Sequence, residues 1–157
     1  MKIRKAEEKD IPVLVDLWWQ MHTFHYKYDK EYYQLLPKRK ACHESQKHLQ
    51  TMLANENTIF LVAEAEGVLL GSLLAHIDHR PPVFSTQKRI LVDHVVVDEK
   101  HRGKGIFSKL QNRLDSISKQ KGAILIELNV DVSNPAVDVY KKKGYFSVQY
   151  KMVKKLK

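Results

Sequence analysis

The sequence is poor in the features that mark secreted and membrane proteins. It contains a single cysteine, Cys42, so no disulfide can form within the chain. Its first ten residues, MKIRKAEEKD, mix acids and bases where a secretory signal needs an apolar core, and we therefore expect a cytoplasmic protein. The longest apolar stretch without a charge, 67–77, is shorter than the roughly 20 residues that cross a bilayer, so we expect no transmembrane helix.

The sequence also lacks low-complexity runs, repeats of solenoid length and linkers longer than a loop. With 157 residues, of which 43% are apolar and 29% charged, it has the length and composition of one folded domain over 1–157. Lys and Arg number 27 against 18 Asp and Glu, which gives a net charge of +9 at pH 7. This excess favours an anionic partner or ligand, but it leaves the fold and the reaction open.

Hydrophobic periodicity changes along the chain and predicts an α/β (α+β) fold. Apolar residues at helical spacing follow Asp10, which is in position to cap that helix, and the aromatic segment 22–37 is expected to connect it to a second helix. Runs of alternating and β-branched residues predict an antiparallel meander. The expected strands are 3–5, 59–65, 68–77, 89–97, 123–130 and a final strand or hairpin at 145–156, and the later helices are expected at 39–55, 105–121 and 134–144.

The run at 123–130, AILIELNV, is almost continuously apolar, as in a strand that is buried on both faces. It follows the strand at 89–97 and the helix at 105–121, and this strand, helix, strand order predicts that the two strands pair in parallel. We therefore expect the run at 123–130 to lie in the centre of the sheet.

The most informative segment is 95–110, VVVDEKHRGKGIFSKL, in which a β-branched strand leads through a turn with two glycines into a helix. Gly103 and Gly105 let the backbone approach a ligand closely, and the free N–H groups at a helix start attract anions. Arg102 and Lys104 add positive charge there. The turn matches neither the G-x-x-x-x-G-K-S/T motif nor the G-x-G-x-x-G motif, so a phosphate would bind by another scheme.

This turn resembles the coenzyme A motif of the GNAT superfamily of N-acetyltransferases, Q/R-x-x-G-x-G/A. Arg102 and Gly105 match it, and Phe107 occupies its last, small position, where the amide can still donate. A second resemblance follows in the family's order, because 129–136 (NVDVSNPA) and 140–145 (YKKKGY) are similar to its Asn, Ala, Tyr and Gly-aromatic motif. The resemblance implies a GNAT-like mixed, mostly antiparallel central sheet with a splayed parallel strand pair, flanked by helices.

The resemblance further implies acetyl-CoA as co-substrate and direct transfer of its acetyl group to a primary amine of a small molecule, peptide or protein. It places the pyrophosphate on the glycine turn, the pantetheine arm against strand backbone, and the sulfur near Tyr140, which would act as the general acid. The implied coenzyme-binding residues are Val95, Val96, Val97, Arg102, Gly103, Lys104, Gly105, Ile106, Phe107, Asn129, Asn134 and Tyr140.

Transfer to an alkyl amine also requires a base, because the ammonium form, with a pKa of roughly 10.4, must first lose a proton. Members of the family often carry an acidic base on the strand before the glycine turn, and Asp93 occupies this place. Glu127 on the next strand is a second candidate. His94 and a water relay stay open as alternatives.

The amine acceptor is expected to enter from the side opposite the coenzyme, where ring faces attract cations. The aromatic residues expected there are Trp18, Trp19, Phe24, Tyr28 and Tyr33. The eight histidines do not predict a metal site. His43 and His48 are five residues apart, whereas the H-E-x-x-H zinc helix needs a separation of four to place both rings on one face.

A rival interpretation is a non-catalytic regulatory module that binds coenzyme A or nucleic acid. Its support is the carboxy-terminal segment 141–157, which contains seven lysines and no acid. We expect the enzyme, with no membrane or nucleic-acid partner, and a homodimer, which is common among similar proteins. The acceptor stays open between polyamines, amino acids, antibiotics, peptide N-termini and protein lysines.

Overall fold

The computed structural model describes residues 1–156 and contains a five-stranded sheet in the order β1-β2-β3-β4-β5. Strands β1 to β4 pair antiparallel with their neighbours, and β5 pairs with β4 in parallel. The predicted meander and the predicted parallel pair are therefore confirmed. The strands are β1 (Lys2–Lys5), β2 (Thr58–Ala65), β3 (Val68–His79), β4 (Lys88–Val97) and β5 (Leu125–Leu128).

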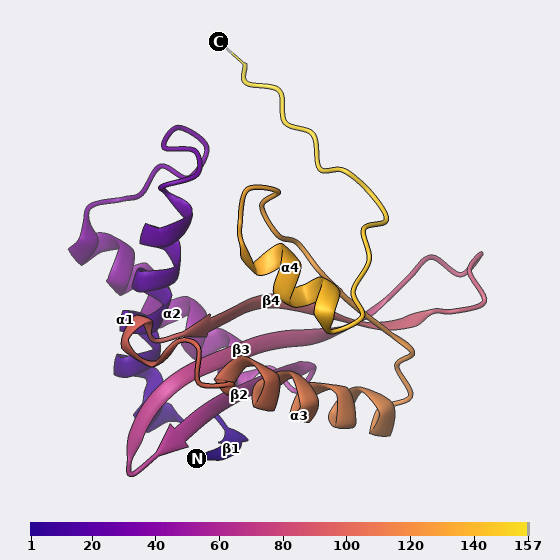
Figure 1. The fold of residues 1–157 in the computed structure, drawn as a ribbon, viewed down its shortest axis with the longest axis horizontal. Coiled ribbons are helices and arrows are strands. Elements are labelled where there is room, and N and C mark those ends of the chain that lie inside the picture. The colour runs from indigo at the N-terminus through magenta and orange to yellow at the C-terminus, as the bar shows by residue number, and fades with distance from the viewer. Residues whose placement is uncertain (157) are drawn as a thin grey trace.

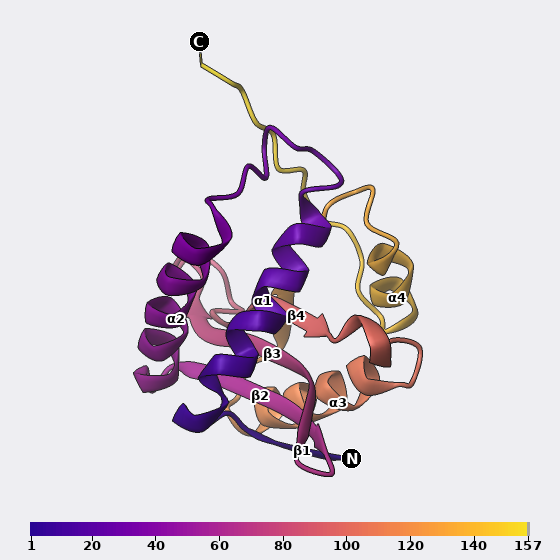
Figure 2. The same cartoon turned by 90° about the vertical axis from the view of Figure 1, so that its left-hand side faces the viewer.

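Helices pack on both faces of this sheet (Figure 1 and Figure 2). Helices α1 and α2 pack on one face, where Leu14 and Leu49 join a core with Leu74 of β3. Helix α3 packs on the other face through Leu110 and Leu114, which lie four residues apart on one side of the helix. The helices are α1 (Ile11–His25), α2 (Lys38–Ala54), α3 (Ile106–Gln120) and α4 (Ala136–Lys142), with short 3-10 turns at Glu8–Asp10 and Glu99–His101. In the described part of the chain, none of the helices is long and apolar enough to cross a membrane.

Asp10 lies at the start of α1, as predicted, but its side chain does not cap the helix. Its carboxylate accepts hydrogen bonds from both terminal nitrogens of Arg4, at 2.7 and 2.9 Å, and from the backbone N–H of Glu7. Arg4 also donates to Glu64 of β2 at 2.6 Å. A part-buried network therefore connects β1, β2 and the start of α1.

The central position predicted for the run at 123–130 is wrong. Only Leu125–Leu128 forms a strand, its four residues are half-buried, and it lies at the edge of the sheet. Ile124, immediately before it, is 71% exposed. A central strand needs a partner on each side, and among residues 1–156 only β4 pairs with β5.

The strand or hairpin predicted at 145–156 is also absent from the structure. These residues take part in no ladder, and the segment leads away from the body of the molecule (Figure 1 and Figure 2). From Phe146 onwards, its large apolar side chains remain exposed to solvent. An alternating pattern makes a segment competent to form a strand, but the strand forms only where another edge supplies its hydrogen bonds.

Candidate active site

The turn between β4 and α3 has a backbone conformation that glycine adopts without strain. Gly103 and Gly105 have φ angles of +76° and +74°, and a Cβ at either position would meet no other atom within 4 Å. The side chain of Ile106 is buried and anchors the start of α3 in the core. The first N–H groups of an α-helix have no partner within the helix, so this turn offers donors beside open space.

Two cations flank these donors. Lys104 is exposed, and Arg102 is held between the end of β4 and the end of α1. The Nε of Arg102 donates a hydrogen bond to the carbonyl of Val97 at 3.3 Å, and its guanidinium carbon lies 5.1 Å from the centroid of the Phe24 ring. Because no carboxylate neutralises it among the described contacts, the guanidinium charge is available to an anion.

Strands β4 and β5 stay together over only part of their length. Their pairing runs from Arg89 opposite Leu125 to Val92 opposite Leu128, and ends there. Beyond this point, 95–97 of β4 pair with β3 alone, and their side chains pack into the two cores. The other main-chain edge of β4 is therefore open beside the glycine turn, so the main chain of 95–97 is available to a ligand.

The loop that leads from β5 into α4 positions two predicted coenzyme ligands differently. Asn129 is exposed, whereas Asn134 is half-buried and its side chain is engaged at the start of the helix. The Asn134 side-chain oxygen accepts a hydrogen bond from the N–H of Ala136 at 2.9 Å. The helix itself begins at Ala136, two residues after the start predicted at 134, and Pro135 occupies the cap position before it.

Tyr140 on α4 belongs to an aromatic cluster with the first turn of α3. Its ring centroid lies 5.5 Å from that of Phe107 and 5.6 Å from that of Tyr145, both in edge-to-face contact. Burial raises the pKa of Tyr140 to about 12, so the phenol keeps its proton at neutral pH. Phe107, which replaces the small residue of the motif, therefore contacts the predicted general acid.

Three of the aromatic residues expected around the acceptor lie close to the glycine turn and to the end of β5. Phe24 contacts Arg102, and the Tyr33 hydroxyl donates a hydrogen bond to Asp131 at 3.2 Å. Tyr28 packs edge-to-face on Phe24, and its hydroxyl is buried without a hydrogen-bond partner. Burial raises the pKa of Tyr28, and the nearby Asp131 carboxylate raises it further.

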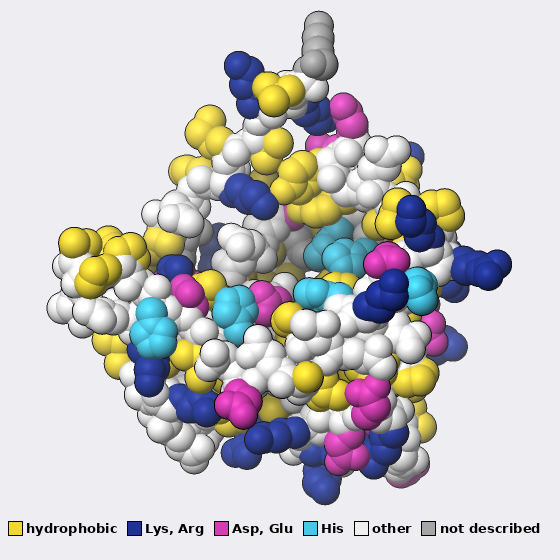
Figure 3. All heavy atoms as spheres, turned by 180° about the vertical axis from the view of Figure 1, so that it is seen from behind, with side chains coloured by type: hydrophobic (Ala, Val, Ile, Leu, Met, Phe, Trp, Pro, Cys, Tyr) yellow, Lys and Arg dark blue, Asp and Glu magenta, His cyan; other side chains and the backbone are white. Residues whose placement is uncertain are grey.

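Asp93 lies at an irregularity in β4. Leu74 of β3 pairs with His94 and Ala75 pairs with Val92, so Asp93 is an extra residue that bulges from the ladder. Its Oδ2 lies 2.8 Å from the Nδ1 of His76 on β3, and each side chain is a little over one-third exposed. Sequence reasoning did not identify His76 as a functional residue, because the pairing depends on the bulge. Figure 3 shows several histidines close to acidic side chains on one face of the molecule.

His94 and Glu127, the alternative bases, are both engaged elsewhere. The indole N–H of Trp18 on α1 donates to His94 Nδ1 at 2.9 Å. Burial lowers the pKa of His94 to about 3, with smaller contributions from His22 and His48, so the ring is neutral and enclosed. Glu127 accepts a hydrogen bond from Arg89 at 2.8 Å.

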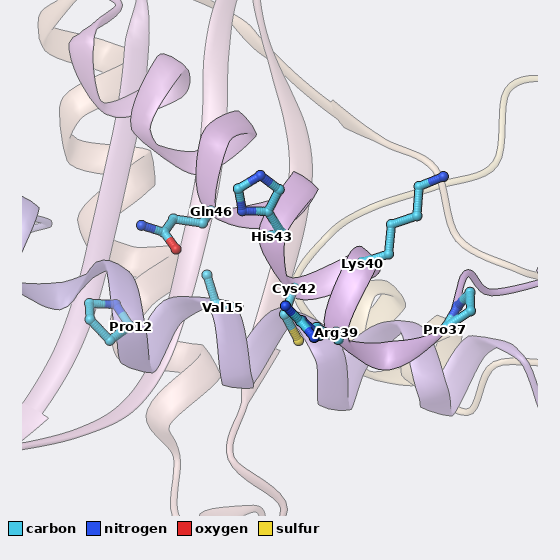
Figure 4. Close-up of a pocket in the computed structure, with 8 residues that line it drawn as sticks. All are labelled: Pro12, Val15, Pro37, Arg39, Lys40, Cys42, His43 and Gln46. Atoms are coloured by element: carbon cyan, nitrogen blue, oxygen red, sulfur yellow. The ribbon is translucent and has the colours of Figure 1, made fainter.

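A large groove of the surface lies elsewhere, between α1 and α2 (Figure 4). It has a volume of about 730 Å³ and shares no lining residue with the groups described above. The groove is lined by Pro12, Val15, Pro37, Arg39, Lys40, Cys42, His43 and Gln46.

Among residues 1–156, no group of three or more His, Cys, Asp or Glu side chains is placed to hold a metal ion.

The fold is similar to several solved structures. These include the tetramutant of BH1408 protein from Bacillus halodurans, with a TM-score of 0.87, 24% identity and coverage of 99% of this chain and 100% of that one. A predicted acetyltransferase from Clostridium acetobutylicum with acetyl-CoA has a TM-score of 0.74, 20% identity and coverage of 98% and 95%. Glucosamine-6-phosphate N-acetyltransferase from Arabidopsis thaliana has a TM-score of 0.74, 21% identity and coverage of 99% and 98%.

The sequence matches the acetyltransferase (GNAT) family over residues 13–145. This range includes the glycine turn, the point where β4 and β5 separate, and Tyr140. Acetyl-CoA is the co-substrate of this family. The match covers most of the chain, which therefore belongs to the GNAT family of acetyltransferases.

Proposed function

We propose that the protein transfers the acetyl group of acetyl-CoA directly to a primary amine of a small molecule, a peptide or a protein. The observation that carries this proposal is the end of β4–β5 pairing at Val92 and Leu128, which leaves an open strand edge next to the glycine turn. An extended arm can pair with such an edge while its phosphates bind the helix start.

The residues around the turn suit the pyrophosphate. The amides of the first turn of α3, including those of Ile106 and Phe107, would donate to its oxygens, and Arg102 and Lys104 would supply charge. The open space above Gly103 and Gly105 allows close approach. The main chain of 95–97 on β4 and of Asn129 after β5 would hold the pantetheine arm, and Asn134 would support the loop between β5 and α4.

The pair of His76 and Asp93 supports amine deprotonation. In this proposal Asp93 accepts the Nδ1–H of His76 and so leaves the Nε2 lone pair free to take the proton of the ammonium group. Asp93 then positions the ring and stabilises its charged form. This assigns the base role predicted for Asp93 to the pair, with His76 as the group that receives the proton.

Tyr140 would supply the second proton. After His76 has passed the ammonium proton to solvent, the amine nitrogen forms a bond to the acetyl carbon and the carbon–sulfur bond breaks. The second proton of the nitrogen then goes to His76, and the Tyr140 phenol protonates the departing sulfur and regains its proton from solvent. The thiolate of a thioester is already a good leaving group. The transfer therefore needs only a proton donor, Tyr140, and a proton acceptor, His76. The raised pKa of Tyr140 supports its role as donor, because the proton is present at neutral pH.

The acceptor would lie against Phe24, Tyr28 and Tyr33, whose rings attract a cationic amine. Asp131, which accepts a hydrogen bond from Tyr33, adds a negative charge at the same wall. These groups favour a positively charged acceptor over a neutral one.

The test is release of coenzyme A thiol from acetyl-CoA across a panel of amines, including polyamines, amino acids, aminoglycosides and peptides. Gly105→Glu, which places a carboxylate in the phosphate site, is the control and should abolish release. Release with at least one amine class is expected. No release with any amine, combined with salt-sensitive binding of nucleic acid, would instead support the regulatory module.

A further inference from the structure

The groove between α1 and α2 lies apart from the candidate active site and has a volume of about 730 Å³. Ligand pockets in proteins have volumes of about 300 to 1,000 Å³, so the groove has the size of a small-molecule site. Its lining comes from the two helices and from Pro37, which precedes α2. On α2 the lining runs from Arg39 to Gln46, a rise of about 10 Å, so the groove is elongated along the helix axis.

The floor of the groove is apolar. Val15 on α1 is 8% exposed, and Cys42 on α2 is half-buried. Pro12 and Pro37 add ring carbons towards the two ends of the groove (Figure 4). An apolar chain that lies along this floor is removed from water on that side, so the floor favours a ligand with such a chain.

The rim of the groove is positively charged on the α2 side. Arg39 and Lys40 line it, both are exposed, and among the described contacts neither pairs with an acid. None of the lining residues is Asp or Glu. Each helix has one acid: Asp16 on α1 is not part of the lining, and Glu44 on α2 lies 3.6 Å from Lys47. The rim therefore favours an anionic ligand.

The charges of the lining are not spread evenly along the groove (Figure 4). Pro12, Val15 and Gln46 are uncharged and lie towards one end. Lys40 lies towards the other end, and Arg39 lies between them. A ligand that matches this distribution has its negative charge at one end of an extended apolar chain.

We propose that this groove binds a free fatty carboxylate of medium chain length. The carboxylate accepts hydrogen bonds from Arg39 and Lys40, and the chain lies over Val15 and Cys42 towards Pro12. A guanidinium can hold a carboxylate through two parallel hydrogen bonds. A second copy of this chain is a poorer occupant, because two such grooves that face each other across a twofold axis bring like charges together. The site is independent of the proposed acetyl transfer.

Cys42, the only cysteine of the chain, reports whether the groove is occupied. N-ethylmaleimide is an uncharged reagent that modifies accessible thiols, and saturating decanoate should slow its reaction with Cys42 about five-fold or more. Acetate has the carboxylate without the chain, and decyltrimethylammonium has the chain with the opposite charge, so neither should slow the reaction. Equal helix signals by circular dichroism show that the protein stays folded with each compound.

No protection of Cys42 by decanoate, or equal protection by decyltrimethylammonium, overturns the proposal. Protection that rises with protein concentration when decanoate is absent identifies a second copy as the occupant and also overturns it.

Two substitutions in the first turn of α2 locate the carboxylate. Arg39→Gln removes a cation from the lining. Lys38→Gln removes the same charge one residue away, where the ammonium lies 5.9 Å from the Trp19 ring centroid and does not line the groove. By titration calorimetry, Arg39→Gln should weaken decanoate binding about three- to ten-fold, and Lys38→Gln should leave it nearly unchanged. Equal weakening in the two variants contradicts the assigned position of the carboxylate and overturns the proposal.

A series of chain lengths tests the apolar floor in the natural protein. From hexanoate to octanoate to decanoate, each added pair of methylene groups should tighten binding about three- to ten-fold, because each pair removes more apolar surface from water. An affinity that does not change with chain length would show that the floor does not bind the chain, and would overturn the proposal.

Discussion

The guanidinium of Arg102 lies over the ring of Phe24, 5.1 Å from its centroid. This contact joins the turn proposed to bind the coenzyme phosphates to the end of α1, where the amine acceptor is proposed to bind. The cation is thereby oriented before any phosphate arrives. A change at Phe24 should therefore affect the KM for both substrates, whereas a change at Tyr33 should affect the KM for the amine alone.

Phe24→Leu should raise the KM for acetyl-CoA and the KM for the amine, each by about three- to ten-fold, because a lost cation–π contact at a partly exposed site is worth about 1 kcal/mol. Tyr33→Phe removes only the hydroxyl that binds Asp131 and should raise the amine KM alone. Steady-state kinetics with each substrate varied in turn measures both effects. An unchanged acetyl-CoA KM in Phe24→Leu would show that Arg102 does not depend on this ring.

Tyr140→Phe should lower kcat by about 100-fold, the usual contribution of a positioned general acid, and leave the affinity for acetyl-CoA nearly unchanged. The substitution retains the ring that packs against Phe107 and Tyr145, so stability should change little. Tyr145→Phe is the matched control in the same cluster and should keep its activity. Equal turnover by Tyr140→Phe and the natural enzyme would remove the phenol from the mechanism.

The pair of His76 and Asp93 should control the pH dependence of catalysis. In the natural enzyme, kcat/KM should rise with pH, because the reaction needs both the free amine and an unprotonated base. His76→Gln should change the shape of this pH profile and reduce kcat/KM by about 100-fold. Asp93→Asn keeps the ring but not its charged partner, and should also change the profile. The charges of Asp78 and Arg89, on the same two strands, are paired with each other and stay in place. Identical pH profiles in all three proteins would exclude the pair.

Substitution of two glycines that share a left-handed conformation should distinguish an effect on phosphate binding from an effect on stability. Gly105 has φ +74° and Gly122, at the other end of α3, has φ +71°, and a Cβ at either position would have no other atom within 4 Å. Alanine at either position should lower the free energy of unfolding by about 1 to 2 kcal/mol, because its side chain disfavours this backbone conformation. Only Gly105→Ala should also raise the dissociation constant for acetyl-CoA, as measured by titration calorimetry. A similar loss of affinity in Gly122→Ala would mean that the loss reflects stability.

His94 should make the protein less stable in acid. Its pKa is lowered from 6.5 to about 3 by burial, so between these values the unfolded chain binds a proton that the folded chain does not. Stability is therefore complete above about pH 6.5 and falls as the pH drops through this window, by about 1 kcal/mol per pH unit for this residue. Urea unfolding at pH 7 and pH 5 measures the fall. His94→Asn retains an acceptor for Trp18, and its free energy of unfolding should fall less between pH 7 and pH 5. A fall as large as that of the natural protein would show that carboxylates alone are responsible.

The sequence predicted the elements whose signals are local. The meander, α3 and the glycine turn follow from periodicity and from glycines that precede a helix, and each lies where it was expected. The pairing of His76 with Asp93 was not predictable, because it depends on an extra residue in β4 that shifts the register between two strands. The contact of Tyr33 with Asp131 joins residues that are 98 positions apart, and no local pattern encodes it.

The sequence by itself determined which segments can be helices and strands, where an anion is expected to bind, and the family to which the chain is similar. Those properties depend on side-chain periodicity, glycine conformation and charge, which act over a few residues. Only the tertiary structure decided that β5 lies at an edge, that β4 opens beyond Val92, and that 145–156 pair with none of the strands in the described part of the chain. The physical reason is that a strand is completed by hydrogen bonds from another strand, and the position of that neighbour depends on the whole fold.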